Sequence, residues 1–345
     1  MKNLSGLLAL TVIISSCSST EYVHLSVMEP APVTLPQSIK HVGVVNRTGV
    51  AKETKIIDVV DKVFSLSSNK LEEEGSKSTI NGLTDALMRN EKFTEVKPLN
   101  TGDLVTIGAG IFPSALEWDQ VDRICKDNNV DALFVLELFH TDAKVSYTPN
   151  PVSMSTALGN IPGIAHEANI TTTVKTGWRI YDPSTRTILD EYPIARSISQ
   201  STVAINPAVA AGEVAARKDA VKEAGGEIGR MYGARIVPYW LRVTRDYFVR
   251  GSGPLSIARR KAQTGNWNEA AALWLEETKN PSPTVAGRAC YNMAIISEIN
   301  GNLEEAIGWA QKAYENYNIR LGLQYVNILR NRKANMDLVK VQASQ

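Results

Sequence analysis

The chain has 345 residues, of which 43% are hydrophobic and 21% charged, as expected for one large or two ordinary globular domains. Lys and Arg number 37 against 36 for Asp and Glu, so the chain has neither a basic excess for nucleic acid nor an acidic excess for a basic partner. Three cysteines and four histidines are too few for a disulfide framework or a cysteine-rich zinc array. We therefore expect a globular protein with no nucleic-acid partner.

The first residues predict an export signal. Lys2 supplies a positive start, residues 7–14 are apolar, and two serines precede Cys17. The apolar stretch is much shorter than the ~20 residues that a membrane-spanning helix needs. We therefore expect residues 1–16 to be a signal peptide.

The sequence ending at Cys17 resembles the lipobox of bacterial lipoproteins, in which the cysteine is acylated and becomes the mature N-terminus. The resemblance implies that Cys17 carries palmitate-type chains and that residues 17–20 are a lipidated tether to the membrane. Ser18 and Ser19 stand where an aspartate retains such proteins in the inner membrane, and no acidic surface-export run follows. The resemblance thus implies the periplasmic face of the outer membrane, with an ordinary signal peptide and a chance cysteine as the alternative.

Two strands are expected at the start of the first domain. Residues 23–27 alternate apolar and polar side chains, and residues 39–45 form a second, more apolar run. Asn46 and Arg47 follow that run, and ligands of open α/β sheets gather beyond the carboxyl ends of strands, so these two residues are a candidate loop site. The alternative is a plain turn that uses Arg47 for a salt bridge.

The next elements alternate between helix and strand. Apolar spacing predicts a helix over residues 78–90 and a short strand over 93–96. Asp119 can cap a second helix, which Asn129 can end in a left-handed conformation. Residues 132–139 are so continuously apolar that we expect a central strand covered on both faces.

A hairpin is predicted further along the chain. Residues 170–180 and 186–198 have strand patterns and are joined by a turn at 182–185. Pro193 cannot donate to a ladder, which places the second strand at a sheet edge or at a bulge. Residues 149–166 are rich in Pro, Gly, Ser and Asn, and we expect a long loop there.

Residues 208–235 predict a long helix, and residues 239–249 predict a last strand before the breaker-rich residues 251–254. Three glycines spaced four apart favour close packing of the helix onto a sheet: Gly225, Gly229 and Gly233. We expect an α/β domain over residues 21–250, with a mixed sheet and flanking helices.

Three stretches of this domain carry a family resemblance. HVGVV at 41–45, NNVDALFVLEL at 128–138 and WRIYDPSTRTILDE at 178–191 resemble the α/β domain of periplasmic lipoproteins related to the N-terminal domain of TolB. Curli-secretion lipoproteins and lipoprotein activators of penicillin-binding proteins share that domain. The whole chain is similar to outer-membrane lipoproteins of Bacteroidota that join such a domain to tetratricopeptide repeats.

The second half of the chain contains an internal repeat. Residues 265–270 (GNWNEA) recur as residues 301–306 (GNLEEA), each after an amphipathic stretch. Both copies resemble the tetratricopeptide repeat, although Lys261 and Ser297 stand where that family has an aromatic residue. We expect an all-α, tetratricopeptide-like helical repeat domain over residues 251–345.

The resemblance implies that the repeats stack into a concave surface that binds an extended peptide or a partner helix. The candidate groove residues are Arg259, Gln263, Tyr291 and Glu298. A further helix over residues 320–340 is expected to cover the end of the array. The alternative is that so short an array only packs on the first domain as a structural cap.

Motifs for catalysis are missing from the sequence, which contains no GxSxG, no HExxH and no Walker-type phosphate loop. Cys125 and Cys290 fall on apolar helix faces and are predicted to be buried thiols. We expect no enzymatic activity, no cofactor and no metal ion.

These patterns favour a non-enzymatic, membrane-anchored periplasmic lipoprotein that acts as an adaptor or scaffold for an envelope protein or peptide through its helical repeats. The first alternative is an accessory component of an envelope secretion or assembly machine, for which residues 149–166 lack the alternating pattern needed. The second alternative, an envelope hydrolase, has no nucleophile or metal ligands to support it.

Overall fold

The structure is a computed structural model, and it describes residues 19–49, 59–100, 102–104, 106–107, 111–156, 159–204 and 214–344. The chain divides into two compact units. Residues 31–238 form one, called the α/β unit below, and residues 239–343 together with the chain before residue 31 form the other, called the ladder–helix unit. Cys17 and the expected signal peptide lie outside the described residues, so lipid attachment stays a prediction.

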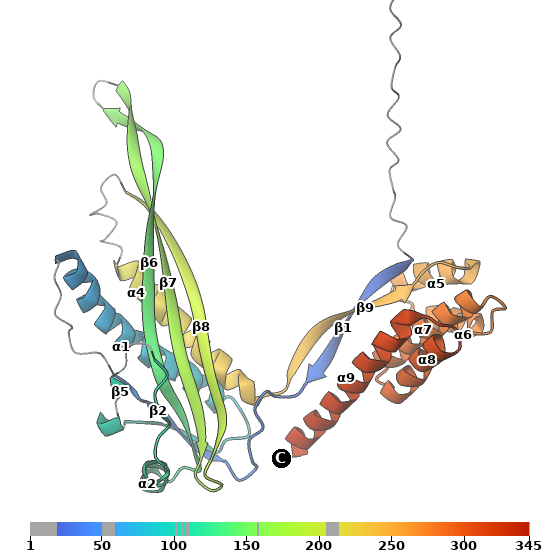
Figure 1. The fold of residues 1–345 in the computed structure, drawn as a ribbon, viewed down its shortest axis with the longest axis horizontal. Helices are drawn as coiled ribbons and strands as arrows, with labels where there is room; N and C mark the ends of the chain where they lie inside the picture. The colour runs from blue at the N-terminus through green and yellow to red at the C-terminus, as the bar shows by residue number, and fades with distance from the viewer. Residues whose placement is uncertain are drawn as a thin grey trace, which may run out of the picture. The chain divides into compact units, whose positions relative to one another are not determined.

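The α/β unit is built on a five-stranded mixed sheet in the order β4-β2-β6-β7-β8 (Figure 1). Its strands are β2 (His41–Asn46), β4 (Glu95–Leu99), β6 (Ala132–Thr156), β7 (Gly159–Asp182) and β8 (Thr187–Ala204). β2 runs parallel to β4 and β6, whereas β7 runs antiparallel to β6 and β8. The expected class, an α/β domain with a mixed sheet followed by an all-α region, is confirmed.

Helices cover both faces of the sheet at its centre. α1 (Val59–Met88) and α4 (Val214–Gly233) share one core with Phe134 and Leu136, and α2 (Trp118–Asn128) shares the opposite core with Leu133 and Val135. Successive side chains of a strand point to opposite faces, so the start of β6 is buried on both sides. This confirms the prediction of a central covered strand.

α2 begins two residues earlier than a cap at Asp119 would place it. Its N-cap is Glu117, which forms a reciprocal capping box with Gln120, and Asp119 lies in the first turn instead. At the other end Asn129 has a φ of 52°, the predicted left-handed stop. The smaller elements of the unit are β3 (Thr48–Gly49), β5 (Thr106–Ile107), η1 (Gly102–Leu104) and η3 (Ala234–Ile236).

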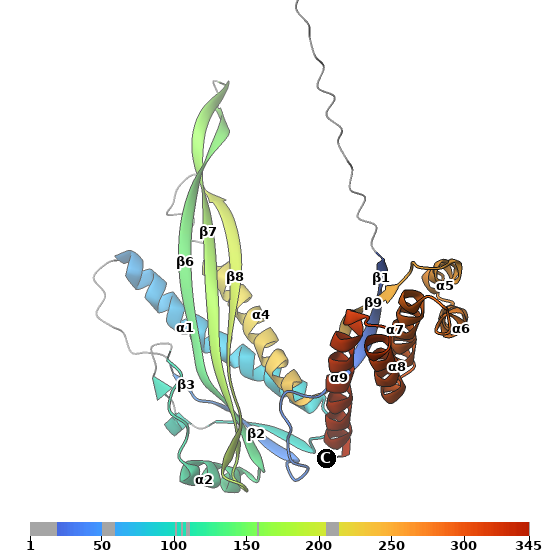
Figure 2. The same ribbon diagram turned by 45° about the vertical axis from the view of Figure 1, so that its right-hand side comes forward.

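The glycines of α4 pack against a helix, so the prediction that they face the sheet is wrong. A Cβ on Gly229 would lie 2.0 Å from the carbonyl oxygen of Thr79, and one on Gly82 would lie 2.1 Å from that of Gly226. Only glycine therefore lets the backbones of α1 and α4 approach so closely, and Figure 2 shows the two helices side by side. α1 also continues through Ser78, the predicted N-cap, whose hydroxyl instead donates to the carbonyl of Lys222 at 2.7 Å.

The predicted loop over residues 149–166 is a second correction. β6 and β7 pair without interruption from Thr148 opposite Glu167 to Thr156 opposite Gly159. β8 ends opposite His166, so a two-stranded hairpin extends beyond the third strand. Proline is tolerated in such edge-exposed strands because the missing N–H can face outward, and a Pro- and Gly-rich composition therefore does not exclude strand pairing. Pro193, as predicted, lies in the edge strand β8.

The ladder–helix unit starts from an antiparallel pair of strands. β1 (Thr20–Glu29) pairs along its whole length with β9 (Tyr239–Phe248), from Thr20 opposite Phe248 to Glu29 opposite Tyr239. Both strands were expected, but within the sheet of a first domain spanning residues 21–250. In the structure they form a two-stranded sheet of their own, and one face of β1, with Val23 and Val27, is buried.

The helices of this unit are α5 (Gly253–Gln263), α6 (Trp267–Glu277), α7 (Pro283–Ile299), α8 (Leu303–Glu315) and α9 (Arg320–Ser344). The repeated glycines Gly265 and Gly301 turn the chain between paired helices with φ values of 84° and 80°, which glycine adopts readily. Ala270 and Ala306, the last residues of the repeated motif, are fully buried. The helix expected over residues 320–340 is α9, and the assignment to tetratricopeptide repeats stays a prediction.

Candidate functional site

Asn46 and Arg47 lie together at the carboxyl end of β2, where a loop site was expected, and their side chains serve different partners. The Asn46 Oδ1 accepts hydrogen bonds from the backbone N–H and the hydroxyl of Thr48, at 3.0 and 2.6 Å. Its Nδ2 donates to the Ser76 hydroxyl of α1 at 3.2 Å. Asn46 therefore shapes the turn after β2 and ties it to α1.

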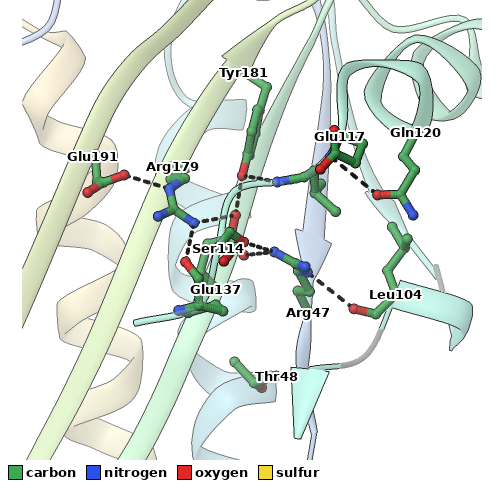
Figure 3. Close-up of polar contacts among 12 residues, drawn as sticks. Arg47, Thr48, Leu104, Ser114, Glu117, Gln120, Glu137, Arg179, Tyr181 and Glu191 are labelled. Atoms are coloured by element: carbon green, nitrogen blue, oxygen red, sulfur yellow. Dashed lines mark hydrogen bonds and ion pairs between the residues drawn. The ribbon is translucent and has the colours of Figure 1, made fainter. Parts of the chain in front are cut away.

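Arg47 reaches a buried carboxylate on the neighbouring strand (Figure 3). Its Nη1 donates to Glu137 Oε2 at 2.7 Å, and the Tyr181 hydroxyl donates to Glu137 Oε1 at 2.5 Å. Arg179 Nη1 lies 3.5 Å from the same Oε1. A carboxylate with no exposed side-chain surface thus sits among two guanidinium groups and a phenol, which offset its loss of hydration.

The same side chains fasten the segment before α2 over the end of the sheet. Arg47 Nη1 donates to the carbonyl of Ser114 and Arg179 Nη1 to that of Pro113, both at 2.8 Å. The Tyr181 hydroxyl accepts from the N–H of Leu116 at 3.0 Å. Burial, followed by the bond to Glu137, raises the pKa of Tyr181, so this phenol stays neutral.

These contacts have a structural role, because they fix the segment before α2 to the sheet. Arg179 completes it by donating through Nε to Glu191 Oε2 at 2.7 Å, so each charged group of the cluster faces an opposite charge. Arg47 forms the salt bridge that the alternative interpretation required. Glu137 and Arg179 are buried and Glu191 is half exposed, and together the contacts hold the segment before α2 against the end of the sheet.

The four candidate groove residues all contact the chain's own strands β1 and β9. Tyr291 and Glu298 are buried, so the expectation that they face a partner from outside is wrong. The Tyr291 ring meets the Phe248 ring edge-on with centroids 5.4 Å apart. Gln263 donates to both carboxylate oxygens of Glu21, at 3.2 and 3.3 Å, and Arg259 forms an ion pair with that carboxylate.

Glu298 is the centre of a second buried charge cluster. Arg245 of β9 donates to it twice, through Nε at 2.9 Å and Nη2 at 3.0 Å, and Arg332 of α9 approaches it at 2.7 Å. The Tyr325 hydroxyl also donates to it. Burial raises the pKa of Glu298, but the hydrogen bonds from these three partners outweigh it and hold the pKa below its ordinary value.

β9 contributes two further anchors to the helices. Asn292 of α7 makes two hydrogen bonds to the backbone of Phe248. The Tyr247 ring packs against Trp267 and Trp274 of α6, 5.8 Å from each ring centroid, and its hydroxyl donates to Glu21 at 3.0 Å. The helical surface that was expected to bind an extended peptide therefore binds an extended segment of the same chain.

The surface of the ladder that faces away from this contact was not singled out from the sequence. It is called the outer face below and consists of Tyr22, His24, Ser26, Met28, Trp240, Arg242, Thr244 and Asp246, which alternate with the residues that face the helices. Tyr22 and Trp240 are its most exposed large side chains, 70% and 67% accessible. A signal for it exists in the sequence, because Tyr22 stands on the polar side of an alternating strand and Trp240 lies within the apolar run of residues 239–241.

The two described cysteines are buried free thiols, as predicted. Burial, with smaller contributions from nearby aspartates, raises the pKa of Cys125 to about 12, so its thiol is protonated and unreactive. Burial also raises the pKa of Cys290. Within the part of the chain that the structure describes, no group of three or more His, Cys, Asp or Glu side chains is placed to hold a metal ion.

Two family models match the sequence. The model described as Domain of unknown function (DUF8603) matches residues 39–248, more than half of the chain. The chain belongs to that family. The DUF8603 region contains the five-stranded sheet and ends at the last residue of β9. A second model, Domain of unknown function (DUF6340), matches residues 256–331, and no curated protein matches the chain.

The chain is also similar to solved structures. One is described as a neuraminyllactose-binding hemagglutinin homolog from Helicobacter pylori, with 14% identity and a TM-score of 0.26 over 60% of this chain and 97% of that chain. Another is the PelC dodecamer from Paraburkholderia phytofirmans, with 10% identity and a TM-score of 0.21 over 63% of this chain and 97% of that chain.

Proposed function

We propose that this DUF8603 protein is a non-enzymatic lipoprotein, held by acyl chains on Cys17 at the periplasmic side of the outer membrane, that acts as a scaffold for an envelope protein. The observation that carries the proposal is the attachment of β1. Two residues separate Cys17 from the start of β1 at Thr20, so the Cα atoms of Cys17 and Thr20 are at most about 11 Å apart. Glu21 is then fixed to α5 through Arg259 and Gln263. An acyl anchor on Cys17 would therefore hold the ladder–helix unit close to the membrane.

The contacts at the helices also bear on where a partner binds. The helical surface that was expected to bind a peptide is occupied by β9, so an external peptide would first have to displace Arg245 from Glu298 and Phe248 from Asn292. Removing one partner of a buried ion pair costs about 3–5 kcal/mol, because the other charge is left buried and unpaired. We therefore propose that the helices serve as a rigid platform and that the partner binds a surface other than this groove.

Membrane anchoring is tested by metabolic labelling with a fatty acid. The wild-type protein is expected to take up label and to sediment with outer membranes, and Cys17→Ala is expected to remain unlabelled and to be released or unprocessed. Crosslinking of the labelled protein in intact envelopes then identifies the partner, which Cys17→Ala should lose. An unlabelled wild-type protein contradicts the proposal.

A second candidate is an accessory component of an envelope secretion or assembly machine. The observation that favours it is the hairpin of β6 and β7, which continues past β8 through residues 149–166. A two-stranded extension of a sheet has open edges on which a neighbouring subunit can pair. Replacing residues 149–166 by a short turn is expected to leave fatty-acid labelling intact and to abolish recovery of an oligomeric complex. Unchanged recovery of the complex excludes this candidate.

A further inference from the structure

The outer face of the β1–β9 ladder has aromatic side chains near both ends and polar side chains between them. Directly opposite residues of an antiparallel pair share one face, so Met28 lies beside Trp240 and Tyr22 beside Asp246. In the middle His24 lies 3.1 Å from the Thr244 hydroxyl, and Ser26 and Arg242 form the next pair on this face: all four are exposed.

This composition differs from that of the buried side of the ladder. The buried side carries Val23 and Tyr247, which join the helical core, and Val27, which is also buried. On the outer face, by contrast, the two large rings are about two-thirds accessible and stand next to hydroxyl, imidazole and guanidinium groups, with the carboxylate of Asp246 opposite Tyr22. Amphipathic tyrosine and tryptophan rings beside a basic side chain are the composition that settles in the headgroup layer of a bilayer.

The position of the ladder in the chain indicates what covers this face. Five residues lead from Cys17 to Tyr22, so the two Cα atoms are at most about 18 Å apart. If Cys17 is acylated, the outer face is kept next to the bilayer at a high effective concentration, which turns even a weak affinity for lipid into stable contact. A protein partner free in solution is not held at a comparable effective concentration near this face.

We propose that the outer face rests on the headgroup layer of the membrane that holds the lipid anchor, with Tyr22 and Trp240 inserted at the interface and Arg242 next to lipid phosphates. The inference rests on the proposed lipid anchoring and adds an orientation to it. The ladder lies flat on the membrane, and the side that carries the helices points away from it.

The test replaces the acyl anchor so that it does not depend on acylation of Cys17. The mature chain, with a hexahistidine tag in place of residues 1–17, is bound through nickel-chelating lipid to vesicles of phosphatidylcholine and phosphatidylglycerol. The emission of Trp240 is obtained as the difference between the wild-type protein and Trp240→Phe. Phosphatidylcholine brominated close to the headgroups is then substituted for the ordinary lipid.

Brominated lipid is expected to reduce the Trp240 emission by about half, and vesicles are expected to shield it from aqueous iodide, because an interfacial ring lies within contact range of the upper acyl chain. Emission unaffected by bromine and equally quenched by iodide with and without vesicles would overturn the proposal. Trp240 already shielded without vesicles, in a manner that depends on protein concentration, would also overturn it and assign the face to a second copy of the chain.

An untagged mature chain gives an independent measurement. The double variant Tyr22→Ser with Trp240→Ser is expected to lower the vesicle partition constant by about tenfold or more, because two interfacial rings are lost. The matched control is Leu275→Ser on α6, which removes an exposed apolar side chain outside the ladder and should leave the constant unchanged. Equal partitioning of all three proteins contradicts the proposal. Failure of fatty-acid labelling with positive bromine quenching would reject the anchor and retain the lipid-binding face.

Discussion

The side chain of Asn292 makes two hydrogen bonds to the backbone of Phe248: its Nδ2 donates to the carbonyl oxygen and its Oδ1 accepts from the N–H, both at 2.7 Å. Asn292 is fully buried on α7, whereas Phe248 is the last residue of β9. The amide thus supplies the pair of bonds that a neighbouring strand would supply. One helix side chain closes this part of the edge of a two-stranded ladder.

Asn292→Ala should destabilise the ladder–helix unit by about 1–3 kcal/mol, because the N–H and the carbonyl of Phe248 are left buried without partners. The midpoint of urea unfolding, followed by circular dichroism, measures the change. Asn268→Ala, at an exposed position of α6, is the control and should stay within about 0.5 kcal/mol of the wild type. Equal midpoints for the two variants would mean that the two hydrogen bonds contribute nothing.

Glu298→Gln should cost about 3–5 kcal/mol near neutral pH, because Arg245 and Arg332 keep their buried charges without a carboxylate between them. The pKa of Glu298 is lower in the folded state than the ordinary 4.5, so its contribution is complete above pH 4.5 and is lost as the pH falls through the folded pKa. The stability gap between wild type and variant should therefore narrow in acid. Urea unfolding at a series of pH values checks this, and a gap independent of pH contradicts it.

Gly229→Ala should destabilise the α/β unit by at least about 1–3 kcal/mol, since the new Cβ would lie 2.0 Å from the backbone oxygen of Thr79 and the helices would have to separate. Gly308→Ala in α8 is the matched change, because no atom lies within 4 Å of a Cβ built there. In that helix the alanine should stabilise by roughly 0.5–1 kcal/mol. Thermal unfolding of the two variants should shift in opposite directions, and shifts of the same sign would refute the close crossing.

Ala270→Leu and Ala306→Leu should each cost about 1–3 kcal/mol through overpacking, because both alanines are fully buried at the start of the second helix of a pair. Ala272→Leu, at an exposed position of α6, provides the comparison and should be nearly neutral. Differential scanning calorimetry measures the melting temperature of each variant and so distinguishes the two buried positions from the exposed one. Unchanged melting of both buried variants would remove the support for equivalent packing in the two repeats.

The local sequence pattern was sufficient to predict the elements whose structural cause lies within one short stretch of the chain. The unbroken apolar run at residues 132–139 predicted a covered central strand, and the turn at 182–185 predicted the hairpin of β7 and β8. Asn129 predicted the end of α2 because few residues adopt positive φ at low cost. In each case one short stretch contains the physical cause.

Pairing between distant segments was not predictable in the same way. The alternation at residues 23–27 indicates a half-buried strand but is silent on its partner, and β9 lies more than two hundred residues away. Composition was also misleading at residues 149–166, where backbone pairing in a hairpin overrides weak side-chain preferences.

The two charge clusters show what the sequence signals and what it leaves out. Glu137 is the only acid in the run ALFVLELF, which indicates a buried carboxylate that needs cationic partners. Its partners Arg47 and Arg179 are 90 and 42 positions away, so only the fold identifies them. Likewise, the repeat pattern predicted that Tyr291 and Glu298 lie on the surface that contacts an extended segment. The pattern did not indicate that this segment is β9.

Because β1 and β9 pair along their full length, residues 31–238 are an insertion between two adjacent points of a smaller protein. At the end of the β1–β9 ladder, Glu29 lies opposite Tyr239. At the start and end of the inserted residues, the Val33 N–H donates to the Arg235 carbonyl at 3.0 Å. β1 is synthesised before the inserted unit and β9 after it, so the pairing of β1 with β9 is a late event in folding. The same closeness of the two junctions means that the inserted unit is exchangeable: a tight turn from Glu29 to Tyr239 would restore a continuous hairpin.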